Sequence, residues 1–195
     1  AFFDRLPEFN LLCPHFHLSL QSGFDATLKR MNRKYTAGDY RSIVSRLRAA
    51  IKDVAITTDI MTGFPGETME EFEYTYRFVE EISFSQAHIF KFSPRKGTPA
   101  AEYSNQVDPG VKEERSQRLI ILTDKLKRQY RSRFVGRKMP VLFEQEVSGK
   151  KGFIEGLTTN YIPVLCKGET SVLGEIKEVT IDRVDDEYVF GTGLK

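Results

Sequence analysis

Apolar residues recur along the first two thirds of the chain with two alternating periods, one near 3.6 residues and one near 2 residues. The longer period predicts helices at 25–33, 39–51, 68–82 and 108–135, opened by Asp25, Asp39, Thr68 and Asp108. Short apolar or alternating runs predict strands at 16–20, 54–61 and 87–92. Strands that alternate with helices indicate a parallel sheet with helices packed outside it, so the fold class is α/β.

The pattern changes beyond Gly136, where glycine-containing or charged turns separate short β-rich runs. These runs are 140–147, 153–157, 161–165, 173–182 and 188–192. Five short strands in so short a segment predict a small closed or half-closed antiparallel β-barrel. We therefore divide the chain into an α/β part at 1–136 and a barrel at 137–195.

Composition narrows the class of protein. The 195 residues are 40% hydrophobic and 29% charged, which argues against wholesale disorder, a collagen-like repeat or a disulfide scaffold. No window approaches the roughly 18 apolar residues of a membrane span, and Asp4, Arg5 and Glu8 interrupt any signal peptide at the start. We expect a cytoplasmic protein without a membrane partner.

Charge is unevenly distributed around a net +2. Residues 1–138 have a net charge of +6 and residues 139–195 one of −4, by the count of Lys and Arg against Asp and Glu. One stretch contains seven basic residues and no acidic one: Lys125, Lys127, Arg128, Arg131, Arg133, Arg137 and Lys138. This density suits a polyanion such as RNA, although basic residues also occur at helix ends because they complement the helix dipole.

Polar side chains alternate with apolar ones on the first strand. Phe16, Leu18 and Leu20 share one face, so His15, His17, Ser19 and Gln21 share the other, and Thr57, Asp59 and Met61 repeat the pattern on the next strand. A polar inner face in a curved parallel sheet indicates a ligand cavity. Cys13, His15 and His17 could hold a metal, but hydrogen-bonded residues of the sheet interior are the favoured interpretation.

A glycine-containing turn, 63–68, follows the second strand and ends where a helix begins. Small-molecule sites of parallel α/β folds lie at the carboxyl ends of the strands. The turn matches neither a phosphate-binding loop nor a dinucleotide fingerprint, and the chain has no Gly-x-Ser-x-Gly motif. Only two cysteines, Cys13 and Cys166, are present, so the chain by itself cannot hold an iron–sulfur cluster.

Four stretches resemble motifs of the radical S-adenosylmethionine methylthiotransferases, in the family's order and spacing: 12–23, 28–36, 59–68 and 92–100. The β-rich tail resembles the TRAM domain that these enzymes use for RNA binding. The form Cys-Pro-His-Phe-His-Leu-Ser-Leu-Gln-Ser-Gly at 13–23 is most similar to enzymes that methylthiolate threonylcarbamoyladenosine in tRNA. The family's cluster motif, Cys-x3-Cys-x2-Cys, is absent, so we expect a carboxy-terminal fragment with half of the radical S-adenosylmethionine barrel.

The resemblance implies a reaction in which cleaved S-adenosylmethionine gives a radical that removes hydrogen from C2 of adenine. A second cluster then supplies sulfur, and another S-adenosylmethionine supplies the methyl group. It implies two 4Fe-4S clusters and an electron donor for the full-length enzyme, with no cluster bound and no activity in this fragment, and tRNA as partner. The implied cofactor-binding residues are Ser19, Gln21, Arg33, Asp59, Gly63, Pro65, Gly66, Glu67, Phe90 and Phe92.

Within this set, the resemblance places Ser19 and Gln21 near the ribose and Arg33 on the methionine carboxylate. The 63–67 turn and the 90–92 strand would surround the adenine. Arg33 is also the clearest physical candidate, because a guanidinium can grip a carboxylate through two parallel hydrogen bonds. Two alternatives stay open: a methylthiotransferase that acts on a ribosomal protein, and an RNA-binding module without catalysis.

Overall fold

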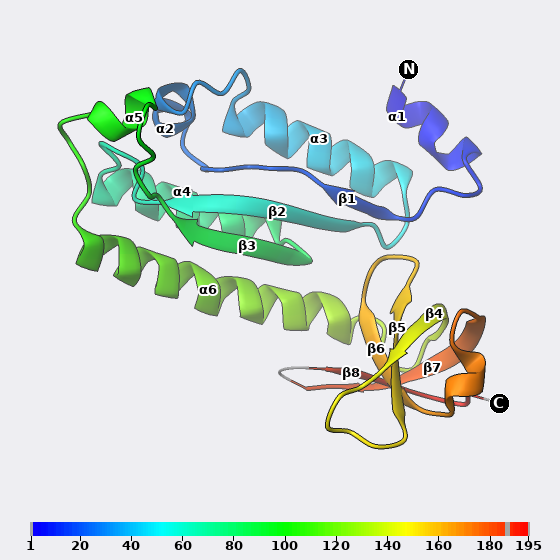
Figure 1. Cartoon of the computed structure of the whole chain (residues 1–195). Coiled ribbons are helices and arrows are strands. Elements are labelled where there is room, and N and C mark those ends of the chain that lie inside the picture. The colour runs from blue at the N-terminus through cyan, green and yellow to red at the C-terminus, as the bar shows by residue number, and fades with distance from the viewer. Residues whose placement is uncertain (1, 186–187, 195) are drawn as a thin grey trace.

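The structure is a computed structural model that describes residues 2–185 and 188–194. It contains a three-stranded parallel sheet covered by helices and, beside it, a small closed β-barrel (Figure 1). The first part consists of α1 (Phe2–Arg5), η1 (Leu6–Glu8), β1 (His15–His17), α2 (Asp25–Arg30), α3 (Ala37–Ala50), β2 (Ala55–Thr62), α4 (Met69–Ile82), β3 (Gln86–Lys91), α5 (Pro99–Glu102) and α6 (Pro109–Ser132). The predicted α/β fold with a partial parallel sheet is therefore confirmed.

The sheet has the order β1-β2-β3, with both pairs of strands parallel. One face of β2 presents Ile56 and Ile60 to a core that α3, α4 and α6 complete through Val44, Val79 and Leu119. The same helices surround the sheet in Figure 1, with α6 running below β3 toward the barrel. The opposite face of the sheet is left for polar side chains.

Two helix starts differ from the sequence prediction. Thr36, and not Asp39, is the N-cap of α3: its side chain accepts a hydrogen bond from the Asp39 N–H, and the Asp39 carboxylate accepts one from the Thr36 N–H. This reciprocal capping box moves the start of the helix back to Ala37. Asp25 is the first residue of α2 rather than its cap, and its carboxylate accepts a hydrogen bond from the Ala37 N–H.

The first strand and the helix after it are shorter than predicted. Regular pairing of β1 ends at His17, although the chain continues beside β2 as far as Gln21, which bridges Ile60. Gln21 has φ 66°, which breaks the extended conformation. α2 ends at Arg30 and not at Arg33, because Asn32 adopts the left-handed conformation at φ 57°.

The barrel is closed, with the strand order β4-β5-β6-β8-β7. Its elements are β4 (Lys138–Glu146), β5 (Phe153–Thr158), β6 (Pro163–Lys167), η2 (Thr170–Val172), β7 (Ile176–Val184) and β8 (Val189–Thr192). The predicted barrel is confirmed, but it is not wholly antiparallel, since β6 and β8 pair in parallel. A short 3-10 turn, η2, precedes the run predicted at 173–182, and strand β7 begins only at Ile176.

The barrel core is continuous with the end of α6 and the start of β2. Tyr130 of α6, Phe134 just after this helix and Ala55 of β2 pack in the same buried cluster as Val141 and Val164 of the barrel. The two parts are thus joined by packed side chains as well as by the chain itself. Among the described residues, no helix is both long and apolar enough to cross a membrane.

Candidate functional site

The inner face of the sheet changes from polar to apolar along the strands. In β2 and β3, Thr57 lies opposite Gln86, Asp59 opposite His88, and Met61 opposite Phe90. Because side chains alternate across a strand, these pairs share the face turned away from the helices. The amino end of the sheet therefore offers hydrogen-bonding groups, and the carboxyl end offers aromatic and thioether surface.

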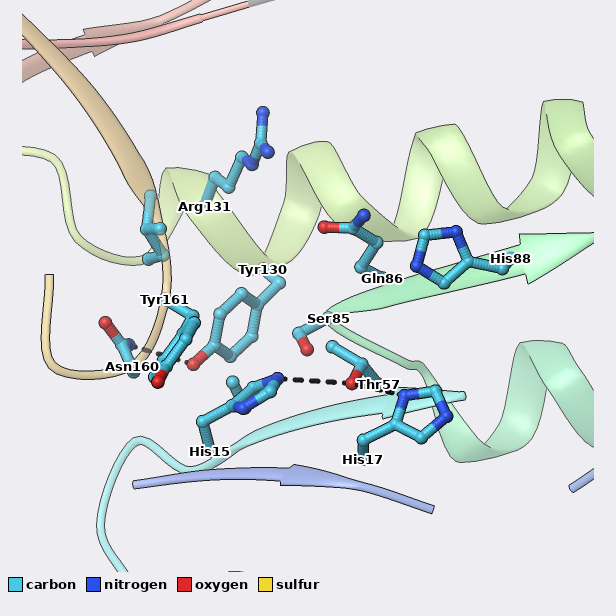
Figure 2. Close-up of a pocket in the computed structure, with 12 residues that line it drawn as sticks. His15, His17, Thr57, Ser85, Gln86, His88, Tyr130, Arg131, Asn160 and Tyr161 are labelled. Carbon is cyan, nitrogen blue, oxygen red and sulfur yellow. Dashed lines mark hydrogen bonds between the residues drawn. The ribbon is translucent and has the colours of Figure 1, made fainter. Parts of the chain in front are cut away.

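A chain of hydrogen bonds follows the polar part of this face (Figure 2). The Thr57 hydroxyl lies 3.2 Å from His15 Nε2 and 3.1 Å from His17 Nδ1, so it bridges the two rings. His17 Nε2 lies 3.2 Å from Asp59 Oδ2, and the Ser19 hydroxyl donates to the same carboxylate oxygen. The pKa of His15 is lowered by burial and by the neighbouring His17.

These contacts bear on the alternative of a metal site at Cys13, His15 and His17. Cys13 is exposed, and both imidazoles have hydrogen-bond partners in Thr57 and Asp59. Within residues 2–185 and 188–194, no three His, Cys, Asp or Glu side chains are arranged to hold a metal ion. The hydrogen-bonded interpretation is the one that the geometry supports.

The largest cavity at the carboxyl end has a volume of about 600 Å³. Gln21 and Arg33, two of the predicted cofactor-binding residues, line it together with Met61 and Phe64. Gln21 reaches it because its N–H bonds the Asp59 carbonyl and its own carbonyl accepts from the Met61 N–H, which fixes the chain at the end of β1. Arg33 is exposed and lies beyond the end of α2, just after the left-handed Asn32.

A second cavity of about 310 Å³ adjoins the first, and Met61, Thr98 and Ala100 line both. Phe90 and Phe92, also predicted to bind the cofactor, line this second cavity. Ser19 and Asp59 line neither; they belong to the polar network with His17. The structure thus brings four of the predicted residues together at the carboxyl end, and it places Ser19 and Asp59 outside both cavities.

The turn predicted to surround a ligand is largely buried and is held by contacts within the protein. Glu67 accepts hydrogen bonds from the Gly63 N–H at 3.0 Å and from Arg115 at 2.6 Å, and it is 6% exposed. Burial raises the pKa of Glu67, against the opposing effects of Gly63 and Arg115. The Gly66 N–H bonds the Asn105 carbonyl, and Pro65 is buried. None of these four residues lines either carboxyl-end cavity.

Glycine at position 63 has a steric reason. Gly63 has φ 69°, and a Cβ there would lie 2.1 Å from the buried side chain of Lys112. Lys112 and Arg115 come from the first turns of α6, some fifty residues later. Sequence reasoning missed both residues, because no local pattern marks them as partners of the 63–67 turn.

The seven basic residues around the end of α6 do not form one surface. Lys125 and Arg128 are exposed, and Lys127 pairs with Asp124. Arg131 is 8% exposed and lines a cavity at the amino end of the sheet. The others contact acidic residues distant in sequence: Arg133 and Arg137 approach Asp53, and Lys138 approaches Glu178.

Asp53 therefore neutralises part of the stretch that contains no acidic residue of its own. Arg137 donates to Asp53 Oδ2 at 2.6 Å, and this hydrogen bond lowers the pKa of the carboxyl group. The pair connects the loop before β2 with the segment that leads into the barrel. Part of the charge predicted to face RNA thus serves to hold the two parts of the molecule together.

Comparison with known proteins is consistent with the division of the chain into an α/β part and a barrel. Residues 1–79 match the profile of the Radical SAM superfamily, and residues 132–194 match that of the TRAM domain. The chain is 41% identical to the threonylcarbamoyladenosine tRNA methylthiotransferase MtaB of Bacillus subtilis over 89% of its own length and 39% of that protein. It is 42% identical to the protein of the same name from Thermotoga maritima, over 96% of this chain and 42% of the relative.

A tRNA-2-methylthio-N(6)-dimethylallyladenosine synthase of Desulfitobacterium hafniense is 37% identical over 92% of this chain and 40% of its own length. The chain thus spans about two fifths of the length of these curated relatives. Among solved structures, coproporphyrinogen III oxidase from Escherichia coli, a radical SAM enzyme, superposes with a TM-score of 0.54 at 16% identity, over 64% of this chain and 29% of that one. That likeness concerns the fold.

Proposed function

The chain combines part of a radical SAM domain with a TRAM domain and is related to the tRNA methylthiotransferases, and from this premise we propose that it is the part of such an enzyme that binds S-adenosylmethionine and tRNA. The proposed substrate is threonylcarbamoyladenosine in tRNA. The observation that supports the proposal most directly is the carboxyl-end cavity, where Gln21, Arg33 and Met61 meet in one space of about 600 Å³.

The residues of this cavity fit S-adenosylmethionine in chemistry. Arg33 and Lys29 supply cationic donors for a carboxylate, and Gln21 supplies an amide for hydroxyl groups. Met61 and Phe64 offer apolar surface, and Phe90 and Phe92 extend that surface into the adjoining cavity. Arg30 lines the cavity, and its buried Nε has no hydrogen-bond partner among the described residues.

The residues of this chain do not fit an iron–sulfur cluster. Cys13 is exposed, and Cys166 is buried in the core of the TRAM domain, where burial raises the pKa of its thiol to about 11. A cluster requires several thiolates on one site. We therefore expect the isolated chain to stay colourless after treatment with iron and sulfide.

When bound, S-adenosylmethionine supplies the radical chemistry and the methyl group of the reaction. The part of this chain is to bind and orient it: Arg33 holds the carboxylate, and Gln21, which is 6% exposed, presents its amide from a fixed backbone. Phe90 and Phe92 contribute apolar surface that excludes water from one wall of the site. Ser19 and Asp59 do not line this cavity; they hydrogen-bond His17, which lines the cavity at the amino end of the sheet.

Binding of tRNA is assigned to the exposed residues of α6, Lys125 and Arg128, together with the TRAM domain. Both residues are exposed, and they belong to the helix that leads from the sheet to the barrel (Figure 1). Cations on a helix surface attract phosphate groups without reading the base sequence. The choice of nucleoside must then come from other contacts.

Equilibrium binding of S-adenosylmethionine to the chain tests the first half of the proposal. Arg33→Ala should weaken binding about tenfold or more, because a charge-assisted pair with the carboxylate is removed. Lys34→Ala is the matched control, since Lys34 is the exposed neighbour and bonds only Asn32 among the described contacts. Equal losses in the two variants would contradict the role of Arg33.

Nucleoside analysis tests the substrate. In cells that lack the complete protein containing this chain, tRNA should lose 2-methylthio-N6-threonylcarbamoyladenosine and retain 2-methylthio-N6-dimethylallyladenosine. The reverse pattern would assign the chain to the second group of relatives. Loss of a methylthio group from a ribosomal protein, with both nucleosides unchanged, would replace the proposal with that alternative.

A further inference from the structure

The junction between the sheet and the TRAM domain is held by a buried set of hydrogen bonds. The Tyr130 hydroxyl of α6 donates to the Asp53 carbonyl at 2.7 Å and accepts from Asn160 Nδ2 at 2.9 Å. The side-chain amide oxygen of Asn160, Oδ1, in turn accepts a hydrogen bond from the Thr158 hydroxyl at 2.6 Å. Asn160 is 2% exposed, so this contact fixes the loop between β5 and β6 against the sheet.

Tyr161 follows Asn160 in that loop and has φ 61°, a conformation that bulky residues rarely adopt. The loop keeps it there, because the Tyr161 N–H bonds the Thr158 carbonyl and the Ile162 N–H bonds the Thr158 hydroxyl. The ring stacks on His15, with centroids 4.4 Å apart and planes 23° apart. Tyr161 is nevertheless 52% exposed, so much of this strained aromatic side chain is open to solvent.

The stacked pair lies at the edge of a cavity of about 230 Å³ at the amino end of the sheet (Figure 2). All three histidines of the chain, His15, His17 and His88, line this cavity. Gln86 and Ser85 add an amide and a hydroxyl, and no carboxylate is among the described lining residues. A cavity of about 150 Å³ is sufficient for benzene, so this one has room for a single planar base.

We propose that this junction cavity binds one unpaired nucleobase of the RNA, stacked against Tyr161 and contacted at its edge by Gln86 and His88. The inference rests on the proposed function, since it names a contact of the same RNA. Stacking on an aromatic ring is the common means by which proteins hold unpaired bases, and amide and imidazole groups bond base edges. The TRAM domain supplies the ring and the sheet supplies the polar groups, so neither part forms the site alone.

The lining favours a base over a phosphate group. Arg131 is the only guanidinium that lines the cavity among the described residues, and in Figure 2 its side chain points away from His15 and Thr57. The pKa of His15 is lowered, so its ring is neutral at physiological pH and gives little attraction to an anion. A neutral, flat and polar ligand matches such a wall better than a charged tetrahedral one.

The test measures binding of the 195-residue chain to short unpaired RNAs that contain 2-aminopurine at successive positions. Stacking on Tyr161 should quench the fluorescence of one position. Tyr161→Gly removes the ring and relieves the strained backbone, so the variant should keep the urea midpoint of the wild type. Its affinity for RNA should fall about 5- to 150-fold, the range that corresponds to one stacked base.

Two further variants test whether the aromatic ring of Tyr161 causes the loss of RNA affinity. Tyr161→Phe keeps the ring and should retain both affinity and quenching. Tyr74→Ala removes another tyrosine with the same 52% exposure from α4, far from the cavity, and should leave binding unchanged. Because stacking involves no counterion release, Tyr161→Gly should also leave the slope of log affinity against log salt unaltered.

Several results would overturn the inference. Wild-type affinity in Tyr161→Gly, or the same loss in Tyr74→Ala, would show that Tyr161 is not a stacking partner. Quenching that survives in Tyr161→Gly would place the base elsewhere. If the wild-type chain binds no RNA at all, the proposed function fails together with this inference; if it binds RNA and Tyr161→Gly binds equally well, only the inference fails.

Discussion

The two ends of the three-stranded sheet have cavities of opposite construction. The described residues that line the carboxyl-end cavity all belong to the α/β part, among them Gln21, Arg33 and Met61. The amino-end cavity combines His15 and Thr57 of the sheet with Tyr130 of α6 and with Asn160 and Tyr161 of the TRAM domain. The first is a site that one folding unit can form by itself, whereas the second exists only when the two parts are docked.

The frameworks behind the two cavities also differ in chemistry. An ion pair between Glu67 and Arg115, with side chains 3% and 5% exposed, supports the turn beside the carboxyl end. Mainly neutral hydrogen bonds through Tyr130 and Asn160 support the amino end. Buried charges cost much more than buried neutral groups when they lose a partner. Mutations at the two ends should therefore differ in how much they lower the free energy of unfolding.

The largest expected effect comes from Glu67→Gln. The substitution leaves the Arg115 guanidinium buried without a counterion, beside an Nε that already has no partner, so unfolding free energy should fall by about 3–5 kcal/mol. Urea unfolding measures this loss. Glu113→Gln is the control, since its pair with Lys91 is half exposed and contributes about 0–1 kcal/mol. Similar losses in both variants would mean that the Glu67 pair is screened like a surface pair.

A smaller loss is expected at the other end from Tyr130→Phe. Removing the hydroxyl leaves the Asp53 carbonyl and the Asn160 amide short of a partner, at a cost of about 1–3 kcal/mol. Tyr103→Phe, at the carboxyl-end cavity, removes a hydroxyl for which no hydrogen bond is described and should cost close to nothing. Urea unfolding of both variants compares the two ends directly. A Tyr103→Phe loss as large as that of Tyr130→Phe would refute the distinction.

The same contrast explains what could be predicted from the sequence. The alternation of periods correctly gave the parallel sheet, its long helix and the barrel, because hydrophobic periodicity is a local property. The alternating polar face of β1 correctly placed His15, His17 and Ser19 on one side. Gln21 and Arg33, which the resemblance proposes as cofactor-binding residues, both line the carboxyl-end cavity.

Contacts between segments that are distant in the chain could not be predicted in this way. The resemblance places Glu67 beside the cofactor, but no local pattern predicts that Arg115 donates to its carboxylate. Arg133 and Arg137 were counted as RNA-binding because no acidic residue is near them in sequence, yet Asp53 lies beside both. The Tyr161 and His15 stack has no local signal, since nothing in either segment indicates the other.

The Asp53–Arg137 pair should make the junction sensitive to acid. The hydrogen bond from Arg137 lowers the folded-state pKa of Asp53 below its unfolded value near 3.9. Its contribution is therefore present above about pH 4 and is lost as the pH falls through the folded-state pKa. Asp53→Asn should cost about 1 kcal/mol in urea unfolding at pH 7, and this difference from wild type should be smaller at pH 3. A constant difference at both pH values would exclude the ion pair as its source.

The smallest effect concerns the salt dependence of RNA binding. If Lys125, Lys127 and Arg128 contact phosphates, each substitution by alanine should reduce the slope of log affinity against log salt by about 0.7–0.9. Arg131→Ala should change the slope less, because Arg131 is 8% exposed. Anisotropy measurements with tRNA at several salt concentrations provide the slopes.

Lys150 and Lys151 of the TRAM domain are the controls for that series. Lys150 lies 3.7 Å from the centroid of the Tyr188 ring, and residues 139–195 have a net negative charge, so these lysines should contribute less than α6. An unchanged slope after the α6 substitutions, with binding abolished by Lys150→Ala and Lys151→Ala, would make the barrel the main RNA surface. The phosphate contacts would then come from the same domain as Tyr161, and the amino-end cavity, rather than the helix above it, would be the place where RNA meets the sheet.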